Sequence, residues 1–314
     1  MTTTSDPQPI LVAAIDAGSN GIRFAIGRVE ANGAFRELEN IRESVRLGAD
    51  AFTHGQFSEA TFAAAAGAFE RFAGLMRANG IEHYRAVATS ATRDTANGKD
   101  LVAHVLAATG IQIEIIDGLE EAHLVFAGVA AEVDLLGKTS LLVDMGGGSV
   151  EITVARDGVA LGCLALPMGG VRLLSQMRAA GKSERDLEEL LVPFQGAAAD
   201  LIRAQLKKKP VEVCVATGGN PNALGRLRVA LLGKSKIGKV KLSDLDSMIE
   251  RLLEMTPGER ETRLELRPDR ADVIVIAAIV LRMIMREAEV TKALTPGVGL
   301  AEGLLRQVAA RVRR

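Results

Sequence analysis

The stretch TSLLVDMGGGSVEITV, residues 139–154, decides the fold. An apolar run ends on the acid Asp144, three glycines follow at 146–148, and after Ser149 the chain alternates with frequent β-branched residues. This pattern predicts a strand, a glycine turn and a second strand. The N–H groups of a glycine turn can approach an anion closely, and a carboxylate beside them could hold a metal ion. The stretch lacks the GxxxxGK[ST] pattern of a Walker P-loop, so an ordinary hairpin turn stays open as the alternative.

The same pattern occurs a second time near the N-terminus. In ILVAAIDAGSNGIRFAIGRV, residues 10–29, an apolar strand runs into Asp16, a small polar turn begins around Gly18, and an alternating strand follows. Asp16 takes the place of Asp144, and Gly18 takes that of Gly146. Two copies, each opening a segment of domain size, predict a duplicated fold with two hairpins that face phosphate.

Composition and charge narrow the class of protein. The 314 residues suffice for two domains, and 48% hydrophobic with 25% charged residues is normal for a globular chain. A net charge of −1 and the absence of Trp argue against a nucleic-acid partner, and no apolar segment has the length of a membrane span. The N-terminus MTTTSDPQP has no apolar signal core, and Cys163 and Cys214 are expected to be buried thiols. These features predict a cytoplasmic protein.

Two further strand ends carry residues suited to anions. One strand is followed by TSATRD at 89–94, which contains Arg93, and a buried-type strand at 211–216 ends in TGGN at 217–220 before a helix. A solvated Arg93 beside a capped helix stays open as the alternative. Strands alternating with helices favour an α/β fold, and the basic stretch 232–242 is expected to be a loop.

Paired acids open a helix in DGLEEAH, residues 117–123. Acids are common in the first turn of a helix because the helix dipole favours them, and that interpretation stays open. The sharper hypothesis is that one carboxylate orients and deprotonates a water molecule beside a phosphate. His123 is expected to lie on the helix surface.

Taken together, the motifs resemble those of the exopolyphosphatase / guanosine pentaphosphate phosphohydrolase (Ppx/GppA) family. The matching segments are DAGSNGIR at 16–23, ATSATRDTAN at 88–97, IIDGLEEA at 115–122, VDMGGGSVE at 143–151, LPMGGVRL at 166–173, VATGGNPNALGRL at 215–227, RADVIV at 270–275 and GLAEGLL at 299–305. The resemblance covers nearly the whole chain and implies a duplicated actin-like ATPase (ribonuclease H-like) α/β fold with an interdomain cleft. We expect an N-terminal domain at 1–124 and a C-terminal domain at 125–314, whose closing helix packs back on the first domain.

The resemblance also implies roles for individual residues. Glu121 matches the catalytic carboxylate that activates water, while Asp144, Glu151 and Asp16 match acids that hold a divalent metal, Mg²⁺ or Mn²⁺, or assist the water. The residues that match phosphate-binding positions are Gly18, Ser19, Asn20, Arg23, Arg93, Gly146, Gly147, Gly148, Ser149, Gly218 and Gly219. Phosphoryl transfer needs positioning, charge neutralisation and an oriented nucleophile, which such a set can supply.

The sequence departs from the family pattern in four places. Gly21 stands in place of a second serine, Asp117 in place of a serine, and His123 in place of an arginine. Asn220-Pro221-Asn222 replaces a threonine-containing turn. The first three changes reduce affinity for phosphate in principle, because they remove a hydroxyl and a cation and add a negative charge.

Several functions are therefore open, and the leading one is a Mg²⁺-dependent exopolyphosphatase acting on polyphosphate. A preference for short chains is expected, because the sequence lacks the added C-terminal helical domains of longer relatives. The alternatives are a guanosine pentaphosphate phosphohydrolase of the stringent response, and a polyphosphate- or alarmone-binding protein with weak catalysis. A sugar or acetate kinase of the same fold is a weaker one. The resemblance also allows a homodimer, since family members often dimerise.

Overall fold

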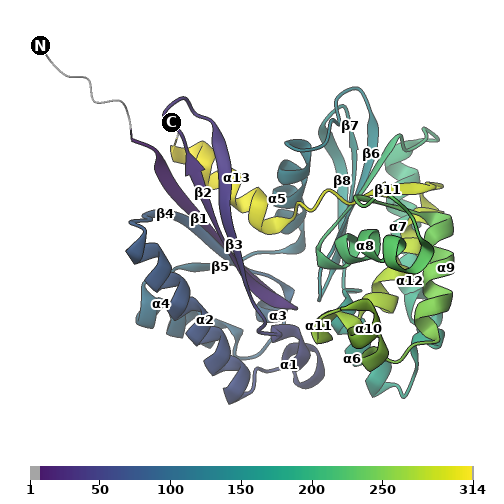
Figure 1. Cartoon of the computed structure of the whole chain (residues 1–314), viewed down its shortest axis with the longest axis horizontal. Coiled ribbons are helices and arrows are strands. Elements are labelled where there is room, and N and C mark those ends of the chain that lie inside the picture. The colour runs from purple at the N-terminus through teal and green to yellow at the C-terminus, as the bar shows by residue number, and fades with distance from the viewer. Residues whose placement is uncertain (1–7, 313–314) are drawn as a thin grey trace, which may run out of the picture. The chain divides into compact units, whose positions relative to one another are not determined.

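The computed structural model describes residues 8–312, so the first seven residues of the polar N-terminus lie outside the described part. The chain divides into two compact units (Figure 1). Unit 1 contains the described residues up to Asp117 and those from Leu300 onward, and unit 2 is Gly118–Gly299.

The division falls at the start of helix α5 (Gly118–Ala130), whereas the sequence analysis placed it after residue 124. The helix stays in one piece because it packs on strands of the second sheet, so a boundary inside it would separate its first turns from their own core. The closing helix α13 (Leu300–Val312) belongs to unit 1, where it packs against the first sheet.

Unit 1 is built on a five-stranded sheet with order β3-β2-β1-β4-β5. Its strands are β1 (Ile10–Gly18), β2 (Gly21–Val29), β3 (Phe35–Glu43), β4 (His83–Ala88) and β5 (Ile113–Ile115). Its other helices are α1 (Leu47–His54), α2 (Glu59–Ala78), α3 (Ser90–Arg93) and α4 (Gly98–Thr109).

Unit 2 is built on a six-stranded sheet with order β10-β11-β9-β6-β7-β8. Its strands are β6 (Thr139–Met145), β7 (Val150–Arg156), β8 (Val159–Leu166), β9 (Val213–Thr217), β10 (Lys239–Lys241) and β11 (Lys292–Leu294). Its helices besides α5 are α6 (Gly170–Ala179), the 3-10 helix η1 (Glu184–Asp186), α7 (Leu187–Leu206), α8 (Gly219–Leu232), α9 (Leu242–Leu253), α10 (Pro257–Leu264), α11 (Pro268–Ala271) and α12 (Ile274–Glu287).

The two sheets repeat one topology, which confirms the predicted duplicated α/β fold. In unit 1 the strands β3, β2 and β1 form an antiparallel meander, and β4 and β5 then add in parallel. In unit 2 the strands β8, β7 and β6 form the same meander, and β9 and β11 add in parallel. The turn at 18–21 joins β1 to β2, and the glycine turn at 146–148 joins β6 to β7.

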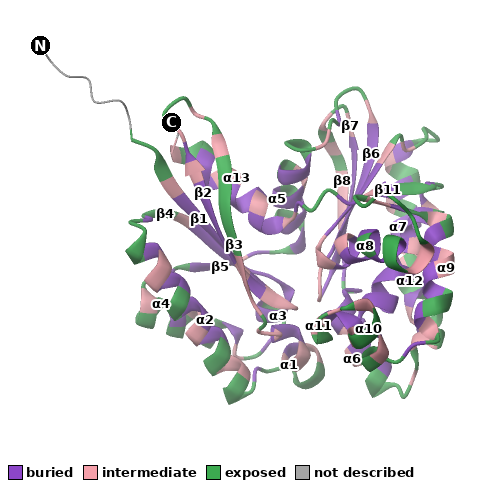
Figure 2. Cartoon of the chain, in the orientation of Figure 1, coloured by how far each residue is buried: buried purple, intermediate pink, exposed green. Residues whose placement is uncertain are grey.

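Successive side chains along a strand point to opposite faces of the sheet, so one face packs into the core and the other carries the acids. In unit 1, Ile15 of β1 and Phe24 of β2 point into the main core, where the ring of Phe24 stacks on that of Phe72 with centroids 5.0 Å apart. Asp16, one residue along β1, therefore points to the other face. Most residues of the inner strands are buried (Figure 2).

Two expectations from the sequence are wrong. The stretch 232–242 is not entirely loop, because Lys239–Lys241 forms strand β10, whose Val240 is fully buried and pairs with Ala293. Cys163 is only half-buried, since it lies on the edge strand β8, whereas Cys214 in the central strand β9 is buried as expected. No helix among residues 8–312 is both long and apolar enough to cross a membrane.

The two thiols are expected to differ in reactivity. Burial raises the pKa of Cys214 to about 12 and raises that of Cys163 as well. Because the thiolate is the reactive form, Cys214 should not react with a disulfide reagent at pH 8 in the native state, and Cys163 should react slowly. Both should react at once in guanidinium chloride. A Cys163→Ser variant that still gave a rapid native thiol reaction would contradict this.

Candidate active site

Three buried carboxylates lie together in unit 2. Glu121, Asp144 and Glu151 each have a carboxylate oxygen within 4.8 Å of the others, and their exposed fractions are only 6%, 8% and 1%. Within residues 8–312 this is the one group of three acidic, histidine or cysteine side chains close enough to share a metal ion. The structure thus brings together the predicted catalytic acid and two of the three predicted metal acids.

The register of the sheet explains why two of the acids meet. Asp144 on β6 and Glu151 on β7 are direct partners in the antiparallel ladder, so their side chains project from the same face. Thr217, at the end of the neighbouring strand β9, donates a hydrogen bond from Oγ1 to Oδ1 of Asp144 at 2.6 Å. This fully buried hydroxyl orients the Asp144 carboxylate.

Helix α5 brings Glu121 to the two strand acids. It packs on β7 and β8, and its first residue, Gly118, lies so close to the sheet that a Cβ atom there would come 2.4 Å from the Cβ of Ala165. A glycine is required for this close approach. Glu120 and His123 on the same helix are exposed, so of the two paired acids only Glu121 turns inward.

The glycine turn 146–148 is fastened to the start of helix α6 by its carbonyl groups. The oxygen of Gly146 accepts from the Gly170 N–H at 3.3 Å, and that of Gly147 accepts from the Val171 and Arg172 N–H groups at 2.8 and 3.0 Å. The oxygen of Gly148 accepts from Nε of Arg172 at 2.7 Å.

The fastened carbonyls determine where the amides of the turn point. The C=O and N–H of one trans peptide point in opposite directions, so the N–H groups of Gly147, Gly148 and Ser149 point away from α6. Three successive N–H groups on one side of a turn form an anion-binding nest. This geometry favours the anion site over the ordinary hairpin turn.

Gly169 and Gly218 pack closely on the backbone at and just before this turn. A Cβ atom on Gly169 would lie 2.4 Å from backbone atoms of Gly147 and Gly148. Gly218 has a φ of +99°, and a Cβ atom there would lie 2.6 Å from the oxygen of Met145. Gly219 then begins α8, a 14-residue helix whose N-terminus favours anions.

Arg270 at the end of α11 is a site residue that the sequence analysis did not single out. It is 9% exposed, and its Nη1 donates to the carbonyl oxygen of Gly219. This places a guanidinium against the glycine turn at 218–219. The only signal in the sequence was the arginine of the RADVIV segment, and nothing in its spacing predicted a contact with residue 219.

The glycine turn of unit 1, at residues 18–21, is also held by hydrogen bonds. The hydroxyl oxygens of Ser19 and Ser90 lie 3.1 Å apart in the interior, so the structure brings the turn and the TSATRD segment together. The carbonyl oxygen of Ser19 accepts from the Gly48 N–H at 2.8 Å. Asp16 faces Arg23 across β1 and β2, and the two strands close on Gly18 and Gly21.

Two of the departures from the family pattern have structural counterparts in unit 1. Arg42 donates to the carbonyl oxygen of Asn20, and its guanidinium covers Gly21 so closely that a Cβ there would lie 2.7 Å from Nη2. A serine at position 21 would therefore displace Arg42. Asp117 is exposed at the end of the unit.

Arg93 makes its described contacts away from the Ser19–Ser90 pair. Its Nη1 donates to the carbonyl oxygen of Ile116 at 2.8 Å, and its Nε lies 3.3 Å from Oδ1 of Asp94. The phosphate-binding roles of Arg23 and Arg93 stay predictions.

The donor set of the three-carboxylate group fits a hard divalent cation. Carboxylate oxygens are ligands that Mg²⁺ prefers, and oxygens on opposite sides of that ion lie about 4.2 Å apart, since each Mg–O bond is about 2.1 Å long. Three carboxylates this close repel one another in the interior, and a divalent ion would offset the repulsion. Asp16, the third predicted metal acid, belongs to unit 1.

A duplicated α/β fold with glycine turns at its strand ends and a buried acid group is typical of enzymes that handle phosphoryl groups. Comparison with known families agrees. The model of the Ppx/GppA phosphatase family matches residues 26–311, and the chain belongs to this family of phosphoanhydride hydrolases.

Relatives and solved structures extend the match. Exopolyphosphatase 2 of Mycobacterium tuberculosis is 34% identical over 296 residues, which cover 88% of this chain and 90% of that protein. The crystal structure of an exopolyphosphatase from Cytophaga hutchinsonii has a TM-score of 0.82 at 23% identity and covers 96% of this chain and 98% of that one. The Aquifex aeolicus member of the Ppx/GppA family has a TM-score of 0.77 at 22% identity, covering 97% and 98%. At these identities the structures show that the fold is shared.

Proposed function

We propose that this protein is an exopolyphosphatase that hydrolyses the terminal phosphoanhydride bond of inorganic polyphosphate. The observation that carries the proposal is that the glycine turn 146–148, whose carbonyls are bound to the start of α6, begins two residues after Asp144, one of three buried carboxylates in the same unit. An anion site next to carboxylates suits a phosphate that must be bound beside a water-activating base. The name of the Mycobacterium tuberculosis relative supports polyphosphate as the substrate.

Different residues of unit 2 would have different roles in hydrolysis. The N–H groups of residues 147–149 would bind oxygens of the terminal phosphate. Glu121 would accept a proton from the attacking water as its oxygen bonds to phosphorus, and the bridging P–O bond breaks to release the shortened chain. Asp144 and Glu151 would hold Mg²⁺ or Mn²⁺. When bound, such an ion neutralises charge on the phosphate oxygens.

Unit 1 has a glycine turn of its own, for which phosphate binding is proposed separately. The Ser19 hydroxyl and the backbone of Gly18 and Asn20 are the groups proposed for this, with Arg23 and Arg93 as cations. Asp16 is the acid of that turn. Each is proposed from the family resemblance and from the position of the turn at the end of β1.

Hydrolysis of guanosine pentaphosphate is a second candidate, favoured by two amide side chains. Among the described residues, Oδ1 of Asn220 and Oδ1 of Asn222 are buried without a hydrogen-bond partner, in the first turn of α8 beside Gly219. Buried acceptors of this kind call for a donor. A nucleoside offers hydroxyl and base N–H donors, whereas ionised polyphosphate offers only acceptors.

Phosphate release from three substrates tests the proposal. Short polyphosphate, long polyphosphate and guanosine pentaphosphate are supplied at equal terminal-phosphate concentration with Mg²⁺. We expect the highest kcat/KM on short polyphosphate. A higher kcat/KM on guanosine pentaphosphate would replace the first candidate by the second. Tight binding of a substrate without any release of phosphate would instead indicate that this is a binding protein.

Mg²⁺ should stabilise the protein through the three-carboxylate group. At a Mg²⁺ concentration about 100 times its Kd, linkage gives roughly 2.7 kcal/mol, and Tm should rise by about 5 °C. A Glu151→Gln variant should lose most of this shift, whereas Glu120→Gln, which changes an exposed neighbour of Glu121, should keep it. Equal Tm shifts in the two variants would show that the ion binds elsewhere.

A further inference from the structure

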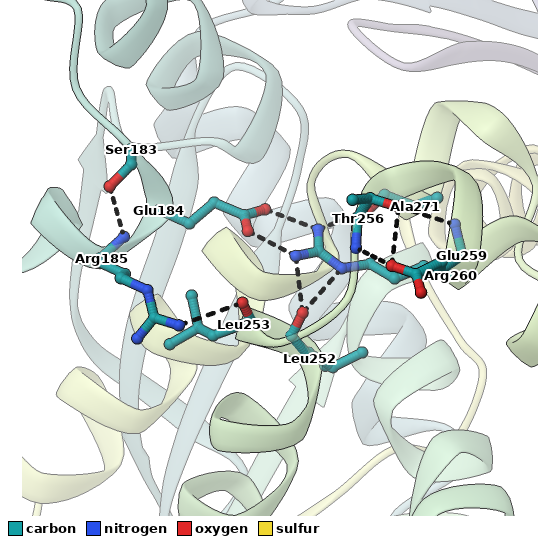
Figure 3. Close-up of polar contacts among 9 residues, drawn as sticks. All are labelled: Ser183, Glu184, Arg185, Leu252, Leu253, Thr256, Glu259, Arg260 and Ala271. Atoms are coloured by element: carbon teal, nitrogen blue, oxygen red, sulfur yellow. Dashed lines mark hydrogen bonds and ion pairs between the residues drawn. The ribbon is translucent and has the colours of Figure 1, made fainter.

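Arg260 on α10 is an arginine in the interior of unit 2 with all of its donors in use. The residue is only 1% exposed. Its Nη1 donates to Oε1 of Glu184 at 2.7 Å and to the oxygen of Ala271 at 3.0 Å. Its Nη2 donates to Oε2 of Glu184 at 2.6 Å and to the oxygen of Leu252 at 2.8 Å, and Nε reaches the latter at 3.2 Å (Figure 3). The five N–H groups of the guanidinium thus have five contacts.

Both residues of this ion pair lie in helices that begin with a capping box. Glu184 lies in η1, which opens with a capping box between Ser183 and Asp186. Arg260 lies in α10, which opens with a capping box between Thr256 and Glu259 (Figure 3). Capping boxes fix the first turn of a helix. The backbone that carries each side chain is therefore held in place, which lowers the backbone entropy lost in forming the pair.

The contact with Ala271 links Arg260 to a break between two helices. Helix α11 ends at Ala271 and α12 begins at Ile274, and we call residues 270–273, the last two of α11 and the two that follow, the joint. Arg260 supplies a hydrogen bond to the carbonyl that closes α11.

The joint contacts the glycine turn at 218–219 directly and is linked to the turn at 146–148 through Gly170. Arg270 donates to the oxygen of Gly219, in the turn after β9. Val273 packs on Gly170, since a Cβ atom on that glycine would lie 3.2 Å from the Cβ of Val273. Gly170 in turn donates to the oxygen of Gly146 in the turn after β6.

We infer that the Arg260–Glu184 ion pair is a positioning device for phosphate binding. By holding the joint it fixes Arg270 and Val273, and through them the turns at 146–148 and 218–219. Arg260 does not touch the substrate, so its loss should act mainly on substrate binding, and Glu121 and Asp144 should keep their places on α5 and β6. The inference rests on the proposed function in that the bound group is a phosphate.

An Arg260→Met variant tests the inference through KM and amide exchange together. We expect KM for short polyphosphate to rise roughly tenfold while kcat changes by less than about threefold, since displacement of a binding group by a fraction of an ångström weakens its contacts. We also expect faster hydrogen exchange in the turns at 146–149 and 217–220 than in the wild type. If Arg260→Met does not fold, the same two measurements are made on Glu184→Gln. This variant keeps the shape of the side chain but removes its charge.

Arg228 supplies the matched control. It is 3% exposed and forms a buried ion pair with Asp244, also in unit 2, but it lies nine residues beyond Gly219 in α8, roughly 13 Å along the helix. Arg228→Met should lower Tm to a similar extent yet leave KM within about twofold and the exchange of both turns unchanged. Equal changes in KM for the two variants would reduce Arg260 to a general stabiliser and overturn the inference. Unchanged turn exchange in Arg260→Met would also overturn it. If the wild type releases no phosphate, the proposed function fails, and the exchange comparison still decides the role of Arg260.

Discussion

A Glu121→Gln variant is expected to lose phosphate release by about 10²–10⁴-fold in kcat, with KM nearly unchanged. The amide keeps the size of the carboxyl group but cannot accept the proton of the attacking water. Glu121 is 6% exposed and belongs to the carboxylate group, which supports the role of base proposed for it. Steady-state phosphate release at saturating Mg²⁺ measures the effect.

The control for this prediction is Glu120→Gln. Glu120 precedes Glu121 on the same helix and carries the same charge, but it is exposed. Its variant should keep kcat within about twofold of the wild type. A Glu121→Gln enzyme with full activity would show that another group takes the proton.

A Gly169→Ala variant should lose a comparable part of its activity through the glycine turn. The new Cβ atom would lie 2.4 Å from backbone atoms of Gly147 and Gly148, so the turn or the start of α6 has to shift. Since a shift of about 1 Å in a binding group can cost roughly 10² in rate, we expect kcat/KM to fall by about that factor. Initial-rate kinetics on short polyphosphate would measure it.

Gly196→Ala is the matched substitution elsewhere in unit 2. Gly196 lies within helix α7, and a Cβ atom there meets nothing within 4 Å. An alanine should stabilise the helix by about 0.5–1 kcal/mol and leave kcat/KM unchanged. If both alanine variants kept wild-type kinetics, the tight contact of Gly169 with the turn would not matter for binding.

Local patterns predicted the parts of this protein that depend on neighbouring residues. Each hairpin is an apolar strand, an acid, a glycine turn and an alternating strand, and the pairing of Asp144 with Glu151 follows from the short turn between them. The duplicated topology followed from the repeat, and the choice of Glu121 over Glu120 followed from the resemblance rather than from helix periodicity.

Contacts between distant residues were not predictable in the same way. Arg270 meets Gly219 across 51 positions, and Arg260 meets Glu184 across 76, and no periodic pattern relates such pairs. The strand β10 is three residues long, too short for alternation to show. The position of the Arg42 guanidinium over Gly21 depends on the register of β2 against β3, and composition does not reveal that register.

The membership of α13 in unit 1 has a consequence for how the protein is made. Unit 2 is one continuous stretch, Gly118–Gly299, so all of it is translated before α13. Unit 1 begins first but lacks the helix that packs on β1, β2 and β4 until α13 has been translated. The half of the protein that is translated first is therefore the half that completes its core last, which reverses the usual order of domain folding during synthesis.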